Sequence, residues 1–325
     1  MRLHKNTELF KEAIKITAER LGIKDIYLEK DYWVTFALRT IFTNKIGGSV
    51  IFKGGTSLVK CFGLIERFSE DIDLTVLRYE NDTDHQLKKK LKQITIVIAN
   101  NLPEIQLDGI TNKMGMIRKT AHTYPHFLKG DFGQVRDTII IESSWLGSFE
   151  PHTTAEVSSY IYDMMIGTEQ NELIQEYNLL PFLVKVLDPK RTLCEKIMSL
   201  VRFSHAENPI ITLNNKIRHV YDIHKILENE ELTTFFNADE FEKMLLKVAN
   251  DDVVSFKNDN HWLKYHPKDA LLFAEPVQTW NQLEQTYQSS FKAMVYGELP
   301  NEADILNTLK LIAKRLENLE WNINI

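Results

Sequence analysis

The sequence predicts a mixed α/β half followed by a helical half, with a boundary near residue 185. Before that boundary, short β-branched runs bounded by glycine alternate with amphipathic stretches. After it, apolar residues recur every three or four positions. The chain has 325 residues, of which 43% are hydrophobic, so it can bury a full core. We therefore expect an α/β (α+β) domain over residues 1–185 and a helical domain over residues 186–325.

Composition excludes several classes of protein. The 39 Lys and Arg against 45 Asp and Glu give a net charge of −6, which argues against a histone-like binder of nucleic acid. The longest apolar runs, 94–99 and 179–184, are far shorter than the roughly 18 residues that a membrane span needs. The first residues lack the apolar core of a secretory signal, and only Cys61 and Cys194 occur. We expect a cytoplasmic protein with reduced thiols and no membrane partner.

The N-terminal elements follow from apolar spacing and from glycine. Residues 9–21 and 32–42 carry apolar side chains three and four positions apart, which predicts two opening helices. The β-branched run 50–52 predicts a short strand. Gly54 and Gly55 stop that run, and the next residues favour the start of a helix. This segment is therefore expected to form a strand, a tight turn and a helix.

The next strand is predicted by strict alternation over residues 71–77. Ile72, Leu74 and Val76 would face one side, and Asp71, Asp73 and Thr75 the other.

The remaining pattern is first mixed and then helical. Residues 88–100 favour a helix with one basic and one apolar face, and 114–144 favours antiparallel strands, most strongly at 138–142. From about residue 188 onward apolar stripes indicate successive helices, and a long amphipathic helix over 303–319 closes the pattern.

Two neighbouring segments carry residues suited to phosphate chemistry. Gly54 and Gly55 open a predicted helix, where backbone N–H groups and the positive helix end can bind a phosphate. Asp71 and Asp73 share one face of the next strand, close enough to hold one or two divalent cations. Such cations bridge triphosphate oxygens and stabilise a leaving pyrophosphate. Either segment alone is common on ordinary surfaces, but their succession favours a nucleotide site.

The spacing of the two segments matches the signature of polymerase-β-like nucleotidyltransferases, and longer stretches resemble one family. Glu29-Lys30-Asp31-Tyr32-Trp33, residues 52–58 and residues 67–74 closely resemble the AbiEii/AbiGii family, the toxin component of type IV toxin–antitoxin and phage-abortive systems. Residues 191–197 resemble the E-K motif of that family, and residues 218–223 resemble its R-D-x-Y-D motif. One position departs from the pattern: His219 stands where the family has the first Asp of the last motif. The departure puts in doubt any role for that side chain and leaves Asp222 intact.

The resemblance implies a polymerase-β-type nucleotidyltransferase sheet with flanking helices, followed by a C-terminal helical domain. It also implies metal-dependent transfer of a nucleotidyl group from an NTP to RNA, with tRNA the favoured acceptor, which would block translation and growth. A cognate antitoxin is implied as well, and it could act without direct binding. Two alternatives stay open: nucleotidylation of a protein hydroxyl, and a nucleotide-binding regulator without catalysis. The intact Asp71 and Asp73 count against the regulator.

The expected site residues begin with the metal ligands. Asp71 and Asp73 would hold Mg²⁺ or Mn²⁺, with Glu142 as a third carboxylate. A carboxylate in the otherwise apolar strand 139–144 is costly to bury unless it is paired or bound to metal. A position on the solvated rim is the alternative for Glu142, and Asp137 is the reserve. The expected nucleotide-binding residues are Gly54, Gly55, Thr56, Ser57 and Lys196.

The helical half is expected to add Lys196 and Asp222. Lys196 falls at the edge of an apolar stripe, so its ammonium could reach into a cleft, or it could be an ordinary surface lysine. Asp222 lies four residues after Arg218, which also fits a simple i, i+4 ion pair. The resemblance implies that both are catalytic, with Lys196 neutralising the triphosphate and Asp222 positioning the lysine or the nucleotide.

Basic residues gather at 88–92 and 113–119. Most such runs are solvated faces, but beside a nucleotide site they could follow an RNA backbone.

Overall fold

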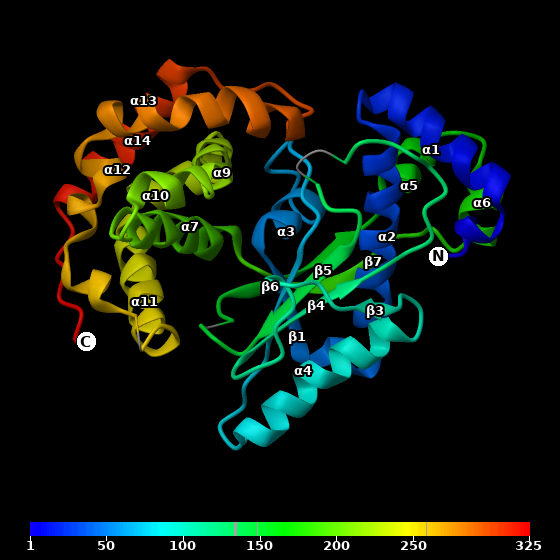
Figure 1. Cartoon of the computed structure of the whole chain (residues 1–325), viewed down its shortest axis with the longest axis horizontal. Helices are drawn as coiled ribbons and strands as arrows, with labels where there is room; N and C mark the ends of the chain where they lie inside the picture. Colours follow the sequence, from blue (N-terminus) through cyan, green and yellow to red (C-terminus); the bar gives the residue numbers. More distant parts are fainter. Residues whose placement is uncertain (133–134, 148, 258) are drawn as a thin grey trace. The chain divides into compact units, whose positions relative to one another are not determined.

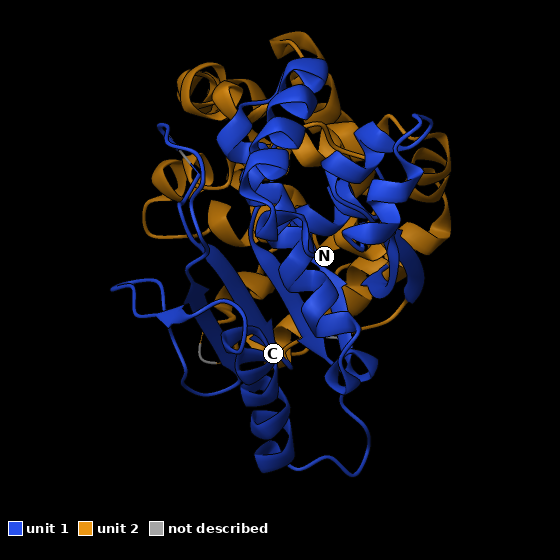
Figure 2. Cartoon of the chain, turned by 90° about the vertical axis from the view of Figure 1, so that its right-hand side faces the viewer, with its two compact units in different colours: residues 1–63, 68–145, 152–187 blue, residues 64–67, 146–151, 188–325 orange. Residues whose placement is uncertain are grey.

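The structure, a computed structural model, describes residues 1–132, 135–147, 149–257 and 259–325, and it divides into two compact units (Figure 2). Unit 1 contains Met1–Gly63, Phe68–Trp145 and His152–Leu187. Unit 2 contains Leu64–Arg67, Leu146–Pro151 and Asp188–Ile325. The expected boundary near residue 185 falls inside a strand, and two short segments of the N-terminal half belong to unit 2, which the sequence pattern did not indicate.

Unit 1 is built on a seven-stranded mixed sheet with the order β3-β4-β5-β2-β1-β7-β6. The strands are β1 (Val50–Lys53), β2 (Ile72–Val76), β3 (Glu104–Ile105), β4 (Ile117–His122), β5 (Ile139–Ser144), β6 (His152–Val157) and β7 (Phe182–Leu187). The β2 strand lies antiparallel to β1 and parallel to β5, and β4 lies antiparallel to β5. The central strands are apolar toward the core, where Val50, Ile72 and Ile139 are fully buried.

The helices of unit 1 pack around this sheet (Figure 1). They are α1 (Thr7–Leu21), α2 (Asp25–Phe42), α3 (Gly54–Lys60), α4 (Asp84–Ala99), α5 (Tyr160–Met165) and α6 (Asn171–Glu176). The α2 and α4 helices contact each other and the strands, whereas α1 and α5 pack on α2. Helix ends carry the expected signals: Asn6 caps α1, and Thr83 with Gln86 forms a capping box at α4.

One predicted boundary is wrong by almost two turns. The α2 helix begins at Asp25 and not near residue 32, so Glu29, Lys30 and Asp31 lie inside it. The three consecutive charges interrupt the apolar periodicity on which the prediction depended. All three are nevertheless buried, with exposed fractions of 1%, 0% and 5%. They can stay buried because each one has partners of opposite charge or backbone donors and acceptors, described below.

Unit 2 contains α7 (Pro189–Ser204), α8 (Pro209–Asn214), α9 (Ile217–Leu227), α10 (Glu230–Asn237), α11 (Asp239–Ser255), α12 (Leu271–Ala274), α13 (Pro276–Thr286) and α14 (Glu302–Glu317). Its first helix starts where Asp188 caps the backbone N–H of Lys190 and proline occupies the first helical position. Trp262 and Trp280 are buried in its core.

Short 3₁₀ segments cover Leu3–Lys5, Lys45–Ser49, His261–Lys264, Pro267–Asp269 and Lys292–Met294, and a π-helical turn covers Tyr287–Phe291. Within the described ranges, no helix has the length and apolar character to cross a bilayer. The predicted α/β class, with a sheet, flanking helices and a helical C-terminal part, is confirmed.

Candidate active site

The centre of the sheet in unit 1 brings three carboxylates together. Asp73 on β2 is the register partner of Glu142 on the parallel strand β5. Register partners on neighbouring strands point to the same face of a sheet. Asp71 stands two residues before Asp73, immediately ahead of β2. The three residues that the sequence nominated as metal ligands therefore lie in one part of the sheet.

Asp73 and Glu142 belong to a row of charges that crosses four strands. Lys53 on β1 is the register partner of Asp73, and Lys119 on β4 is the register partner of Glu142. The Lys119 ammonium lies 2.9 Å from the Glu142 carboxylate. The order across the sheet is thus lysine, aspartate, glutamate, lysine. Sequence reasoning missed both lysines as site residues, because only the strand pairing reveals them.

The carboxylates raise the proton affinity of the site. Burial, and then the negative charges of Glu142 and Asp71, raises the pKa of Asp73 to about 7, while Lys53 and Lys119 act in the opposite direction. The Asp71 Oδ1 atom is buried and has no hydrogen-bond partner. Arg136 Nη1 lies 3.7 Å from it. A site with several carboxylates close together, one of them with an oxygen that lacks a hydrogen-bond partner, is suited to bind a cation.

Gly54 allows the Asp73 carboxylate to lie against the start of α3. Its φ is +83°, in the left-handed region that side chains disfavour. A Cβ atom at this position would lie 2.2 Å from Asp73 Oδ2. Any other residue would therefore displace the carboxylate, so Gly54 is required here for a steric reason in addition to its backbone conformation.

The two hydroxyl residues after the glycines are buried and already hydrogen-bonded. Thr56 Oγ1 donates to the Asp71 carbonyl oxygen at 2.6 Å and lies 2.9 Å from Ser69 Oγ. Ser57 Oγ donates to the Gly54 carbonyl oxygen at 2.8 Å. The Thr56 contacts tie α3 to the segment that carries Asp71, whereas the Ser57 bond lies within α3. Gly54 and Gly55 are more accessible than either hydroxyl.

Lys30 and Glu70 form a buried ion pair directly behind Asp71. The Lys30 ammonium also donates to the carbonyl oxygens of Arg136 and, at 2.8 Å, of Thr138. The Glu70 carboxylate accepts from the Arg136 backbone N–H at 3.2 Å. This pair therefore fixes both the residue before Asp71 and the loop that enters β5.

The charged neighbours of Lys30 hold other segments. Glu29 accepts from the backbone N–H groups of Phe127 and Leu128 at 2.7 and 3.1 Å. Asp31 pairs with Lys60 at the end of α3 and accepts from the Tyr160 N–H at 3.0 Å. Three consecutive residues of α2 thus anchor three different parts of unit 1.

Unit 2 contains a second charged cluster, centred on Asp222, which is fully buried. Arg67 Nε and Nη2 donate to its two oxygens at 2.7 and 2.8 Å, and Lys196 Nζ donates to Oδ2 at 2.7 Å. Burial alone would raise the pKa of Asp222, but the charges of Arg67 and Lys196 hold it well below its usual range. The sequence nominated Lys196 and Asp222 but not Arg67, which lies 155 positions from its partner.

His219, at the position where the sequence departs from the family motif, lies beside this cluster. Burial, followed by the charges of Lys196 and Lys216, lowers its pKa well below the usual value. Its Nδ1 atom is buried and has no hydrogen-bond partner. The imidazole is therefore neutral at physiological pH and contributes no charge next to Lys196.

The acidic residues do not form a finished metal cage. No group of three or more His, Cys, Asp or Glu side chains in the described part of the chain is arranged to hold a metal ion. The Glu142 side chain is 40% exposed and paired with Lys119, and the reserve residue Asp137 is exposed on the loop before β5. Mg²⁺ commonly takes one or two carboxylates and completes its shell with water and substrate phosphates. Asp71 and Asp73 fit that mode.

Comparisons with known proteins give a family match and likenesses to solved structures. The family model described as "Nucleotidyl transferase AbiEii toxin, Type IV TA system" matches residues 37–311. Among solved structures, the chain is similar to MenT4, the nucleotidyltransferase toxin Rv2826c from Mycobacterium tuberculosis H37Rv, at 14% identity. That likeness covers 92% of this chain and 98% of the other, with a TM-score of 0.47. The search of curated proteins gave no match.

Proposed function

Because the chain belongs to the AbiEii family of nucleotidyltransferase toxins of type IV toxin–antitoxin systems, we propose that it transfers a nucleotidyl group from an NTP to RNA. The favoured acceptor is tRNA, and the outcome is blocked translation in the cytoplasm. The observation that carries the proposal is the register of Asp73 with Glu142 beside Asp71, which concentrates negative charge at one point of the sheet.

The transfer needs a divalent cation, Mg²⁺ or Mn²⁺, held by Asp71 and Asp73. The raised pKa of Asp73 supports this assignment, as does the buried Asp71 Oδ1 atom, which has no hydrogen-bond partner, because a cation would stabilise both carboxylates. Bound there, the ion would neutralise phosphate charge and favour loss of pyrophosphate. Glu142 stands beside this pair as the third carboxylate and is held in place by Lys119.

In the reaction, the acceptor hydroxyl loses its proton to a water molecule and its oxygen bonds to the α-phosphorus of the NTP. The bond to the β-phosphate oxygen breaks, and pyrophosphate leaves with those electrons. The backbone N–H groups of Gly54 and Gly55 bind phosphate oxygens at the start of α3. Thr56 holds the carbonyl of Asp71, and Ser57 holds that of Gly54, so their hydroxyls keep these two groups in position.

Lys196 supplies positive charge for the triphosphate, and Asp222 positions it. The ammonium is shared with the Asp222 carboxylate, whose other bonds come from Arg67. This bond gives Lys196 a fixed location, which a flexible surface lysine would not have.

Labelled transfer tests the proposal. The full chain is incubated with each of four labelled NTPs, Mg²⁺ and total RNA, and label is then read on RNA and on protein bands. Label on purified tRNA from at least one NTP is expected. Label on a protein band only would replace the RNA acceptor with a protein hydroxyl. No label from any NTP, with Mg²⁺ or Mn²⁺, would contradict the proposal.

A further inference from the structure

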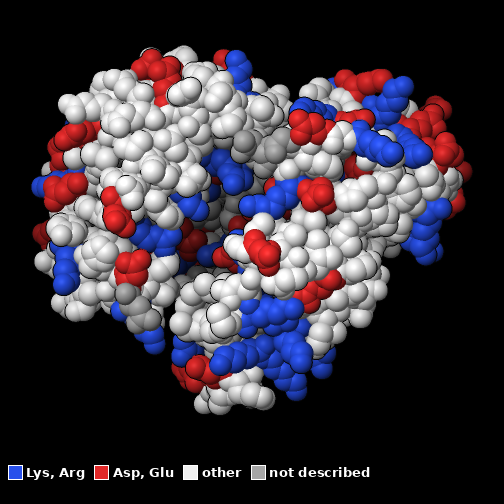
Figure 3. Space-filling model, viewed as in Figure 1, with Lys and Arg blue, Asp and Glu red and all other residues white. Residues whose placement is uncertain are grey.

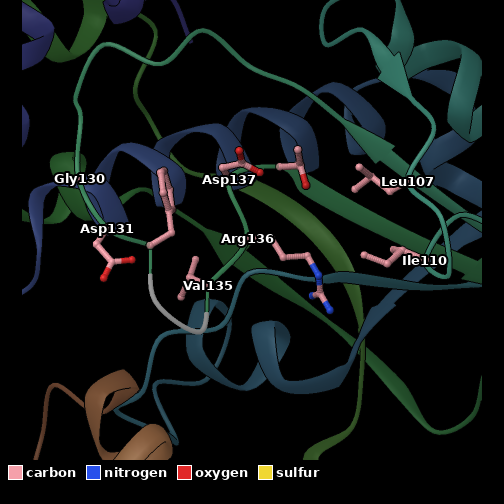
Figure 4. A pocket seen from close by; sticks show the side chains of 9 residues that line it. Leu107, Ile110, Gly130, Asp131, Val135, Arg136 and Asp137 are labelled. Atoms are coloured by element: carbon pink, nitrogen blue, oxygen red, sulfur yellow. The ribbon is translucent and has the colours of Figure 1, made fainter.

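A pocket of about 520 Å³ opens in unit 1 (Figure 4). Arg136, one of its lining residues, has its Nη1 atom 3.7 Å from Asp71 Oδ1. Its lining residues come from the segment after β3 and from the loop before β5: Leu107, Ile110, Gly130, Asp131, Phe132, Val135, Arg136, Asp137 and Thr138. The volume lies in the range of roughly 300 to 1,000 Å³ that is typical of small-molecule sites. The metal-ligand assignment makes no use of this pocket.

The wall that carries Arg136 is held by the buried Lys30–Glu70 ion pair. Lys30, which is fully buried, donates to the carbonyl oxygens on both sides of Asp137, and Glu70 accepts from the Arg136 N–H. Burying two opposite charges requires several kcal/mol of desolvation per ion, which good geometry must offset. Here the pair fixes three residues of pocket wall, so the wall is preorganised.

The pocket has an apolar side and a charged side. Leu107 and Ile110 are half-buried and expose part of their side chains, and Val135, on the loop before β5, is buried. The Arg136 side chain extends from the loop that also carries Val135 toward the segment that carries Ile110 (Figure 4). Its guanidinium reaches to 3.7 Å from Asp71 Oδ1, so the charged end of the pocket adjoins the carboxylates.

These features match one class of ligand. A nucleobase is a flat apolar plate with a polar edge, and both aliphatic side chains and a guanidinium plane can pack against its face. Asp137 is exposed on the same wall, and a carboxylate accepts hydrogen bonds from an exocyclic amino group such as cytosine N4. A phosphate or ribose attached to the base could then reach Arg136 and the carboxylate site.

We propose that this pocket binds a nucleotide whose base carries an exocyclic amino group, with the base on Leu107 and Ile110 and the sugar-phosphate directed by Arg136 toward Asp71. The inference rests on the proposed function and adds to it the subsite that selects the base. Two nucleotides could be the source: that of the NTP and the terminal one of the acceptor RNA.

The test fills the pocket and leaves the carboxylates intact. Ile110→Trp places a large ring over the apolar side, and Ile166→Trp, an exposed position outside the pocket lining, is the matched control. The KM values for NTP and for RNA are measured separately with both variants. An increase of about tenfold in one KM with kcat nearly unchanged is expected, because uniform binding is lost.

A change in the KM for NTP assigns the pocket to the donor nucleotide, and a change in the KM for RNA assigns it to the acceptor. If both values stay within about twofold of the control, the inference is wrong.

A binding measurement separates this inference from the proposed function. Labelled CMP and UMP at millimolar concentration are dialysed against the full chain without NTP or RNA. We expect CMP to bind more tightly than UMP, Ile110→Trp to lose both, and Asp137→Ala, at an exposed position, to remove the preference for CMP. These results would support the pocket even if no transfer were found. Equal binding of CMP by the wild type and by Ile110→Trp, or no binding by the wild type, would overturn it.

Discussion

At the scale of single residues, Asp73 combines a functional role with a cost in stability. Its carboxylate lies against Gly54, and burial, followed by the negative charges of Glu142 and Asp71, raises its pKa. A cation-binding group that repels its neighbours in the empty site is a typical compromise between activity and stability. Replacement by asparagine should separate the two effects.

Asp73→Asn should abolish nucleotidyl transfer, because a metal ligand is lost. It should also stabilise the cation-free protein by roughly 1 to 2 kcal/mol, because a desolvated charge and its repulsion by Glu142 and Asp71 are removed from a half-buried position. Asp71→Asn should abolish transfer with less effect on stability, since Arg136 lies beside Asp71. Label transfer and chemical denaturation without divalent cations check both statements. A variant that transfers label at the wild-type rate would contradict the metal assignment.

The pKa of Asp73 also predicts how cation binding depends on pH. Its value is about 7 in the folded chain, against 3.8 as the usual value, so the folding penalty is full above pH 7 and fades as the pH falls toward 4. Cation binding needs the ionised form, so affinity should fall by about tenfold per pH unit below pH 7. Mn²⁺ binding measured from about pH 8 to about pH 5.5 tests this. A flat profile would show that the cation does not displace a proton from Asp73.

Lys196 can be compared with a lysine of the same helix. Lys196→Ala leaves Asp222 buried with Arg67 as its remaining partner and should raise the KM for NTP about tenfold or more. Lys190 is a half-buried lysine at the start of α7 that pairs with the exposed Glu231, so Lys190→Ala is the control. Equal effects of the two changes would indicate general electrostatics and not a specific contact.

At the scale of elements, sequence patterns predicted what depends on neighbouring residues. The strand, turn and helix around Gly54, the alternation of β2 and the antiparallel pair of β4 and β5 are found as expected. Local glycine and side-chain periodicity suffice for such elements. The β6 and β7 strands were not predicted, because β7 reads as one short apolar run and β6 has a largely exposed surface.

The site could be predicted only in part for the same reason. Asp71 and Asp73 share a strand, so their common face follows from local alternation. The row of charges from Lys53 to Lys119 could be predicted only from the pairing of β2 with β5. The partners Asp73 and Glu142 lie almost 70 positions apart in the sequence. Arg67 and Asp222 are separated by 155 positions, and no local pattern joins them.

The α2 helix offers a test of its buried charges. Lys30→Met should lower the free energy of unfolding by about 3 to 5 kcal/mol, because Glu70 would remain buried without its partner. Lys15→Met, an exposed position on α1, is the control and should change it by less than about 0.5 kcal/mol. Chemical denaturation measures both. If the two variants are equally stable, the Lys30–Glu70 pair does not hold unit 1 together as described.

At the scale of the whole molecule, the net charge of −6 opposes binding to RNA, so any affinity must come from local positive surface. Figure 3 shows Lys and Arg side chains gathered over α4, where Lys88, Lys89 and Lys92 are exposed. Lys90 differs from them, because it donates to Asp82 at 2.6 Å and to the Leu77 carbonyl oxygen at 3.1 Å. The exposed lysines are therefore the ones to change.

The dependence of RNA binding on salt can show whether α4 contacts the acceptor. Each neutralised phosphate of a single strand releases counterions and adds about −0.7 to the slope of log affinity against log salt. Lys88→Glu with Lys92→Glu should therefore flatten the slope by about 1.4 if both contact phosphate, while the KM for NTP stays unchanged. Lys243→Glu with Lys247→Glu is a matched control, since these exposed lysines of α11 have the same spacing. A slope that changes equally in both double variants would mean that RNA responds to net charge alone. An unchanged slope in the α4 variant would place the acceptor path elsewhere.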